Sequence, residues 1–128
     1  MARVLLVDDE KVFRASLAQR LRLRGYEVAE AGNGAEAVRA VSRDADIDVV
    51  ILDYKMPGMK GEHVLREIKE SRPAAAVIML TAFGCHQVAG VWSYLEKPCE
   101  LEELIGAIES ARKGGLPPPK HQRKDHGC

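Results

Sequence analysis

The chain has 128 residues, of which 46% are hydrophobic and 30% charged, and 19 basic side chains balance 19 acidic ones. This length fits one domain whose core is large enough to fold without disulfides, and it leaves no room for a second catalytic domain. Residues 112–128 carry five Lys/Arg against one Asp, a net charge of +4, so residues 1–111 carry −4. An acidic body with a basic tail argues against direct nucleic-acid binding by the fold.

The three cysteines and the lengths of the hydrophobic runs indicate the cellular compartment. Cys85, Cys99 and Cys128 are odd in number and have no C-x-x-C spacing, so neither a disulfide framework nor a zinc site is indicated. No run approaches the roughly 18 apolar residues that span a membrane, and no signal peptide precedes the first predicted strand. We expect a soluble cytoplasmic protein without a membrane partner.

Predicted strands and amphipathic helices alternate along the chain. The predicted strands span residues 4–7, 26–31, 49–53 and 76–80, with a short fifth strand from about residue 92. The predicted helices lie around residues 13–21, at 35–42, around 64–68 and at about 100–112. Gly25 ends the first helix, and the continuously apolar Val49–Asp53 is typical of a central strand covered on both faces. This alternation predicts stacked βαβ units around a parallel sheet.

Polar side chains follow the predicted strands where each strand ends. Asp8 and Asp9 come directly after the first strand, and Asp53 ends the third. Thr81 follows the fourth strand, and Lys97 follows the fifth. Ligands of open α/β sheets bind in the crevice at the carboxyl ends of the parallel strands, so we expect these five side chains to converge there.

The expected cluster favours a divalent cation and a phosphoryl group. Carboxylates gathered this closely repel one another unless a cation neutralises them. Oxygen ligands select Mg²⁺, Ca²⁺ or Mn²⁺, and Mg²⁺ suits a site with few protein ligands because it keeps several waters and is often completed by phosphate oxygens. In phosphoryl transfer, Asp53 would attack and become an acyl phosphate, Lys97 would supply an amine and Thr81 a hydroxyl.

At these residues the chain resembles the receiver (CheY-like) domain of two-component response regulators. The segments that carry the resemblance are Asp8-Asp9, Ala31 to Ala37, Leu52 to Gly61 around Asp53, Thr81-Ala82 and Lys97-Pro98. The resemblance covers about residues 2–112 and implies a doubly wound, flavodoxin-like sheet of five parallel strands in the order 2-1-3-4-5. We therefore expect a receiver domain at residues 1–113 and a disordered, Pro-rich basic tail at 114–128.

The resemblance also implies a function and a set of site residues. Mg²⁺ would be held by Asp9, Asp53 and the backbone carbonyl of Lys55, with Asp8 acting partly through water. Asp53 would take its phosphoryl group from a phosphohistidine on a histidine kinase or phosphotransfer protein. Such a domain is a signalling phosphoacceptor and not an enzyme in the usual sense, because it catalyses only its own phosphorylation and dephosphorylation. The phosphorylated state would alter a partner-binding surface.

The chain departs from the family between Thr81 and Lys97, where about six residues are missing. The connection that remains between the two strands is about as short as a parallel crossover allows. This predicts a shortened or missing fourth helix. The sheet would then be left uncovered near the fourth and fifth strands, with Phe83, Val88, Val91 and Trp92 over or beside it. We expect a downstream partner or self-association there. The alternative is that Trp92 folds down as a plug.

Two other functions compete with the phosphoacceptor hypothesis. Gly32, Gly34 and Ala37 satisfy the pattern G-x-G-x-x-A of a nucleotide-binding module, with Asp53 near the place of a ribose ligand. That hypothesis leaves the other strand-end residues without a role. The second alternative is a receiver-like interaction domain that is never phosphorylated. Taken alone, the pair Asp8-Asp9 is also typical of a simple helix N-cap.

Overall fold

A computed structural model of the chain describes residues 3–53, 61–81, 91, 93–96 and 100–113. Its strands are β1 (Arg3–Val7), β2 (Glu27–Ala31), β3 (Ile47–Asp53), β4 (Ala76–Thr81) and β5 (Ser93–Glu96). Its helices are α1 (Lys11–Leu23), α2 (Gly34–Arg43), α3 (Gly61–Ser71) and α4 (Leu101–Arg112). The expected tail at 114–128 lies outside the described residues, so the predicted domain boundary stays a prediction.

The five strands form one parallel sheet in the order β2-β1-β3-β4-β5, as predicted. Strand β3 lies at the centre and is buried along its length except at Asp48. It begins two residues earlier than predicted, because Ile47 is buried while the exposed Asp48 accepts a hydrogen bond from the Arg3 amide at 3.2 Å. Sequence periodicity finds the buried run and misses a strand end that contains one exposed acid.

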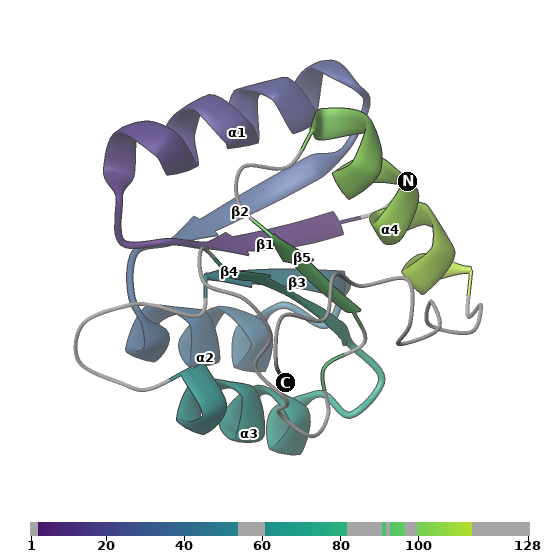
Figure 1. The fold of residues 1–128 in the computed structure, drawn as a ribbon. Coiled ribbons are helices and arrows are strands. Elements are labelled where there is room, and N and C mark those ends of the chain that lie inside the picture. The colour runs from purple at the N-terminus through teal and green to yellow at the C-terminus, as the bar shows by residue number, and fades with distance from the viewer. Residues whose placement is uncertain (1–2, 54–60, 82–90, 92, 97–99, 114–128) are drawn as a thin grey trace, which may run out of the picture.

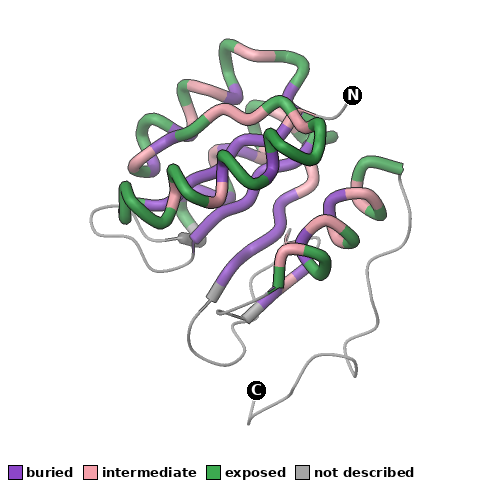
Figure 2. The backbone as a smooth tube through the Cα atoms, turned by 90° about the horizontal axis from the view of Figure 1, so that it is seen from above, coloured by how far each residue is buried: buried purple, intermediate pink, exposed green. Residues whose placement is uncertain are grey.

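Helices cover both faces of the sheet, with α1 and α4 on one face and α2 and α3 on the other (Figure 1). Alternate residues of the strands enter two separate hydrophobic clusters, since successive side chains point to opposite faces. The cluster under α2 and α3 includes Val7 and Leu52, and the cluster under α1 and α4 includes Leu6 and Ile51. The buried interior therefore follows the strands while the outer helix faces are exposed (Figure 2).

Helices α2 and α3 bury their regularly spaced apolar residues. Helix α2 buries Ala37 and Val41, with Val38 packed against the same cluster, and α3 buries its three apolar positions at 64, 65 and 68. In α1, Ala18 and Leu21 are buried, whereas Phe13 is 38% exposed. The helix is rotated so that the residue after Phe13 turns toward the sheet.

Gly25 ends α1, as predicted, and needs its glycine. Its φ is +95°, a left-handed conformation that other residues adopt at a cost, and its amide donates to the Arg22 carbonyl at 3.0 Å. Just beyond it, the Tyr26 hydroxyl donates to the Glu109 carboxylate of α4. Burial, and then this hydrogen bond, raise the pKa of Tyr26 to about 12. The turn after α1 is thereby tied to α4.

Eleven residues, 82–92, join β4 to β5, and of these only Val91 is described. Val91 is partly buried and packs against the cluster under α2 and α3. The described part of the chain holds four helices, which is consistent with the predicted missing helix. Phe83, Val88 and Trp92, which were expected to lie near this sheet surface, are outside the described residues.

Candidate functional site

The strand register brings the first and third strand ends together. Val7, the last residue of β1, pairs with Leu52 of β3, so Asp8 and Asp53 each follow at the next position on neighbouring strands. Asp53 is in turn paired with Leu80, one residue before the end of β4. The acids that lie 45 positions apart in the sequence are adjacent because parallel strands present their carboxyl ends at one edge.

Three carboxylates converge at this edge. Asp8, Asp9 and Asp53 each offer an oxygen, and the three oxygens lie within 4.8 Å of one another. Asp8 is 1% exposed and Asp53 is 6% exposed, whereas Asp9 is exposed to solvent. Among the described residues, this is the group of acids and histidines that has the spacing of a metal site. Burial of two like charges beside a third favours the binding of a cation.

The donor set fits Mg²⁺ by its chemistry. All three side chains offer carboxylate oxygens, which are hard ligands, and no sulfur or imidazole joins them within the described residues. The exposed Asp9 leaves the site open on one side, where waters and the oxygens of a phosphoryl group can complete an octahedral shell. The three acids converge as the strand ends predict, and their role as Mg²⁺ ligands stays a prediction.

Hydrogen bonds fix the main chain around Asp8. Its amide donates to the Ala31 carbonyl at 3.1 Å, and its Oδ1 accepts from the Glu10 amide at 2.9 Å. Glu10 is the N-cap of α1 and has no side-chain cap hydrogen bond of its own. The simple capping explanation of the acidic pair is therefore only partly right, because Asp8 holds the turn before the helix while the exposed Asp9 contributes its carboxylate to the acidic cluster.

Arg14 also contacts this turn, and this contact was not predicted from the sequence. The Arg14 Nη1 donates to the Asp8 main-chain carbonyl at 2.6 Å, and its Nε donates to Glu30 Oε1 at 3.1 Å. Arginines occupy positions 14, 20, 22 and 24 in and just after α1, and nothing in the sequence separates Arg14 from the others. Its spacing of six residues from Asp8 is the one signal available, and that signal is weak.

The remaining predicted site residues are described only in part. Thr81 ends β4, where its backbone pairs with Glu96 of β5, and its side chain is not among the described atoms. Lys97 follows β5 directly in the sequence, and Lys55 lies just after Asp53, but both are outside the described residues. Their roles stay predictions.

The turn between β2 and α2 is built from its own hydrogen bonds. Asn33 caps α2 by accepting from the Glu36 amide at 2.9 Å, and Glu36 Oε1 accepts from the Gly32 amide at 2.7 Å. The pattern is similar to a capping box, except that Glu36 accepts from the residue before the N-cap and not from the N-cap amide itself. The Gly32 amide has its partner within the turn, and this favours a structural explanation of the glycine pattern.

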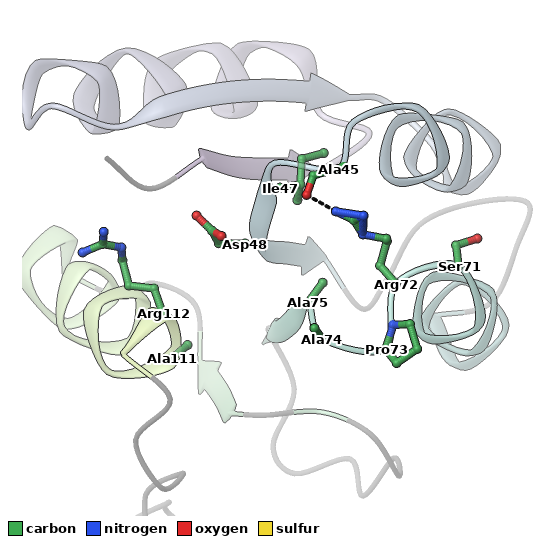
Figure 3. A pocket seen from close by; sticks show the side chains of 10 residues that line it. All are labelled: Ala45, Ile47, Asp48, Ser71, Arg72, Pro73, Ala74, Ala75, Ala111 and Arg112. Carbon is green, nitrogen blue, oxygen red and sulfur yellow. Dashed lines mark hydrogen bonds between the residues drawn. The ribbon is translucent and has the colours of Figure 1, made fainter.

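An open pocket of about 500 Å³ lies at the opposite edge of the sheet (Figure 3). Its charged side chains already have partners within the chain. Arg72 donates to the Ala45 carbonyl, Asp48 accepts from the Arg3 amide, and Arg112 pairs with Glu109. It lacks the gathered acids of the carboxyl edge, which therefore is the better candidate.

None of the described helices is long and apolar enough to cross a membrane.

Comparisons with known proteins bear on the same residues. The family model of the response regulator receiver domain matches residues 4–109. The transcriptional regulatory protein PdtaR of Mycobacterium tuberculosis is 42% identical over 116 residues, which cover 85% of this chain and 56% of PdtaR. The transcriptional regulatory protein GlrR of Escherichia coli is 38% identical, with 91% of this chain and 27% of GlrR covered. The chain thus spans between about a quarter and just over half of these relatives.

A solved structure gives the same likeness at the level of the fold. A response regulator receiver domain protein from Clostridium thermocellum superposes with a TM-score of 0.82 at 35% identity, over 89% of this chain and 96% of that one. The response regulator TrrA from Thermotoga maritima, solved with Mg²⁺ and BeF, has a TM-score of 0.79 at 34% identity, over 87% of this chain and 99% of TrrA. TrrA has also been solved in complex with the histidine kinase ThkA.

Proposed function

The chain belongs to the response regulator receiver domain family, and we propose that it is a phosphoacceptor of a two-component phosphorelay in which Asp53 takes the phosphoryl group. The observation that carries this proposal is the convergence of three carboxylates within 4.8 Å at the carboxyl edge of the sheet. Asp53 stands at the end of the central strand, where a donor can approach from outside the sheet.

The proposed reaction is an in-line transfer from a phosphohistidine. A carboxylate oxygen of Asp53 attacks phosphorus, a new P–O bond forms, and the P–N bond to the donor imidazole breaks. The electron pair of that bond returns to the imidazole nitrogen, which then takes a proton from solvent. The product is an acyl phosphate on Asp53. The chain thereby acts as a signalling phosphoacceptor whose chemistry is confined to its own aspartate.

The other site residues would prepare and stabilise this step. Asp9, Asp53 and the Lys55 carbonyl would hold Mg²⁺, with Asp8 acting partly through water. When bound, the cation supplies positive charge that offsets the charge of the acids and of the phosphoryl oxygens. Thr81, the last residue of β4, and Lys97, which follows β5 in the sequence, would donate to the same oxygens.

The donor is proposed to be a histidine kinase or a phosphotransfer protein, and we expect the exchange in the cytoplasm. The structure of TrrA with the kinase ThkA supports a kinase partner by likeness. The curated relatives are longer than this chain and several are transcriptional regulators, so the output of the complete protein is a separate question from the chemistry of this domain. Direct nucleic-acid binding by residues 1–113 is not part of the proposal.

The effect of phosphorylation is proposed to appear at the surface beside β4 and β5, where a downstream protein or a second copy of the chain would bind. The phosphoryl group adds about 1.5 to 2 negative charges at pH 7, and the segments that carry Thr81 and Lys97 would move to meet it. Val91, between those segments in the sequence, is partly buried against the cluster under α2 and α3. An apolar patch beside it would be a surface that a partner can cover.

Trp92 offers a probe of this surface because it is the single tryptophan of the chain. Its fluorescence should change when Asp53 is phosphorylated or carries a beryllofluoride adduct, and Thr81→Ala should weaken the change. Sedimentation in both states would detect self-association. An unresponsive Trp92 together with monomers in both states would remove the proposed surface while leaving the phosphoacceptor role intact.

The phosphoacceptor role is tested by incubation with acetyl phosphate and Mg²⁺. Intact-mass analysis should show one added phosphoryl group that base and hydroxylamine release, as expected of an acyl phosphate. Asp53→Asn should abolish it, and Asp48→Asn, the same substitution at the other end of β3, should not. Labelling that survives Asp53→Asn would overturn the assignment, and no labelling of the wild type would favour the interaction domain that is never phosphorylated.

A further inference from the structure

We propose that Arg14 is a positioning residue for the acidic site, holding the turn of Asp8 and Asp9 in the geometry that binds the divalent cation. The inference rests on the proposed function, in which this site takes Mg²⁺. Its starting observation is the 2.6 Å hydrogen bond from Arg14 Nη1 to the main-chain carbonyl of Asp8. A bond from a charged donor is stronger than one between neutral groups.

Arg14 is held from a second direction. Its Nε lies 3.1 Å from Glu30 Oε1 on β2, and Arg22 Nη2 lies 3.4 Å from the other oxygen of the same carboxylate. The Arg14 side chain is only 16% exposed and that of Glu30 27% exposed, so the pair is partly shielded from water. The guanidinium is planar, and two bonds at different edges of the plane fix its orientation.

The consequence for the site follows from the peptide plane. The Asp8 amide is bonded to Ala31 and its Oδ1 to the Glu10 amide. The carbonyl of Asp8 belongs to the peptide unit that leads into Asp9, so the Arg14 bond sets the tilt of that unit. Without it, the Asp8–Asp9 peptide loses this restraint, and the exposed Asp9 carboxylate samples positions away from Asp8 and Asp53.

Gly32 leaves the space that Arg14 occupies. A Cβ added at Gly32 would come within 3.0 Å of Arg14 Nη1, closer than most real contacts of this kind. Glycine at this point of the β2–α2 turn therefore allows the guanidinium to lie against the backbone while it reaches Asp8. Three elements, α1, β2 and the turn into α2, thus contribute to one contact with the acidic turn.

Positioning and simple charge make opposite predictions. A guanidinium near the acidic cluster repels a divalent cation, so if charge were its only effect, removal of Arg14 would tighten Mg²⁺ binding. If Arg14 positions the turn, its removal weakens binding, because ligand orientation by outer residues is commonly worth 10-fold to 100-fold in metal affinity. The sign of the change separates the two.

The experiment measures Mg²⁺ affinity by isothermal titration calorimetry on the unphosphorylated chain, at fixed pH and ionic strength. Arg14→Met keeps much of the side-chain volume and removes both hydrogen bonds, and we expect binding about tenfold weaker. Arg14→Lys keeps the charge but replaces the planar fork by a single ammonium, which cannot hold Asp8 and Glu30 in the same fixed geometry. We expect binding at least about threefold weaker for this variant.

Arg22→Met is the matched control, since Arg22 lies on the same helix and shares the partner Glu30. Its Nη2 donates to the Val28 carbonyl at 2.9 Å, and it makes no contact with Asp8 among the described hydrogen bonds. We expect its Mg²⁺ affinity within about twofold of the wild type. Circular dichroism without metal verifies that each variant is folded, and if Arg14→Met is not, Arg14→Lys alone decides.

The outcomes are distinguishable. Weaker binding in Arg14→Met and Arg14→Lys, with Arg22→Met unchanged, supports the positioning role. Equal or tighter binding in the folded Arg14 variants overturns it and leaves the proposed function standing. A wild type that binds no Mg²⁺ overturns the metal site of the proposed function, and this inference with it.

Discussion

The two edges of the sheet arrange their charges in opposite ways. At the amino edge, acids and bases alternate: Arg3 pairs with Asp44 at 2.6 Å and with Glu27 at 3.0 Å. At the carboxyl edge, three carboxylates gather within 4.8 Å, and two of them are buried. Both edges belong to the same parallel sheet, so the fold alone does not dictate the difference.

The two edges differ in what their charges do: ion pairs stabilise the fold, whereas gathered like charges favour the binding of a cation. The partly exposed ion pairs of the amino edge each contribute little to the free energy of unfolding, and they do not favour the binding of a ligand. Like charges held together at the carboxyl edge cost folding free energy, which a bound cation recovers. The pocket at the amino edge is a hollow of about 500 Å³ without this electrostatic demand, so it is charge and not concavity that favours the carboxyl edge as the candidate site.

The largest expected effect is stabilisation by Mg²⁺ at the carboxyl edge. At a free concentration about 100 times Kd, a ligand that binds only the folded state adds about 2.7 kcal/mol to the free energy of unfolding. For a domain of this size that is a rise in Tm of roughly 10 °C. Asp9→Ala should abolish most of the rise in a thermal scan, whereas Asp48→Ala at the amino edge should keep it. Equal rises in wild type and Asp9→Ala would mean that the metal binds elsewhere.

Without metal, the same edge should gain stability when one charge is removed. In EDTA, Asp9→Asn should raise Tm by a few degrees, because it relieves repulsion with the buried Asp8 and Asp53. Asp48→Asn should leave Tm nearly unchanged, since asparagine can still accept from the Arg3 amide. Thermal scans of the two variants beside the wild type make the check. A decrease in Asp9→Asn would show that the cluster is not under electrostatic strain.

A smaller effect is expected at the contact between Tyr26 and α4. Tyr26→Phe removes the hydrogen bond to the Glu109 carboxylate, and we expect a loss of about 0.5 to 1 kcal/mol near pH 7 from urea unfolding. This contact supports the turn after α1 and lies away from the acids. Mg²⁺ affinity should therefore be the same in the variant, and a large change would mean that the two regions are coupled.

The pH dependence of that difference has a definite sign. The hydrogen bond from Tyr26 lowers the pKa of Glu109, so this contribution is present above about pH 4.5 and is lost as the pH falls below it. The pKa of Tyr26 is raised to about 12, so its contribution is present below about pH 10 and is lost as the pH rises toward 12. The stability gap between wild type and Tyr26→Phe should be widest between these limits. A constant gap from pH 3 to 11 would contradict the contact.

The smallest effect is expected for the ion pair of Arg24 and Glu102, which joins α1 to α4. Hydrogen bonding to Arg24 lowers the pKa of Glu102, but both side chains are largely exposed, at 43% and 69%. Water and salt screen such a pair, so Arg24→Ala should leave Tm unchanged within error. A clear decrease in Tm, and its disappearance in high salt, would show that this pair contributes more than an ordinary surface contact.

The sequence predicted the three converging acids but not the side chains that hold their turn in place. The convergence of Asp8, Asp9 and Asp53 follows from one rule, because each acid comes where a buried parallel strand ends. The resemblance to receiver domains supplied the strand order, which local pattern does not determine. In α1 the sequence predicted the helix but not its orientation, in which Phe13 is exposed and Arg14 contacts Asp8.

The missed contacts share a physical reason. Which arginine of α1 meets Asp8 depends on the rotation of the helix over the sheet, and packing of Ala18 and Leu21 sets that rotation. Glu30, the partner of Arg14, lies on an edge strand where an exposed acid is ordinary. Only the three-dimensional arrangement distinguishes these two side chains from their neighbours in the sequence.

Mn²⁺ can locate the cation directly, because it binds the same carboxylate ligands as Mg²⁺ and broadens the NMR signals of nearby amides. If the charge of the carboxyl edge makes the site, the cation binds there and not in the pocket of the amino edge. Substoichiometric Mn²⁺ should broaden the amide signals around Asp8, Asp9 and Asp53 and spare those of Ala45, Asp48 and Arg72, and excess Mg²⁺ should restore them. Broadening centred on the amino edge, or none at the carboxyl edge, would contradict this prediction.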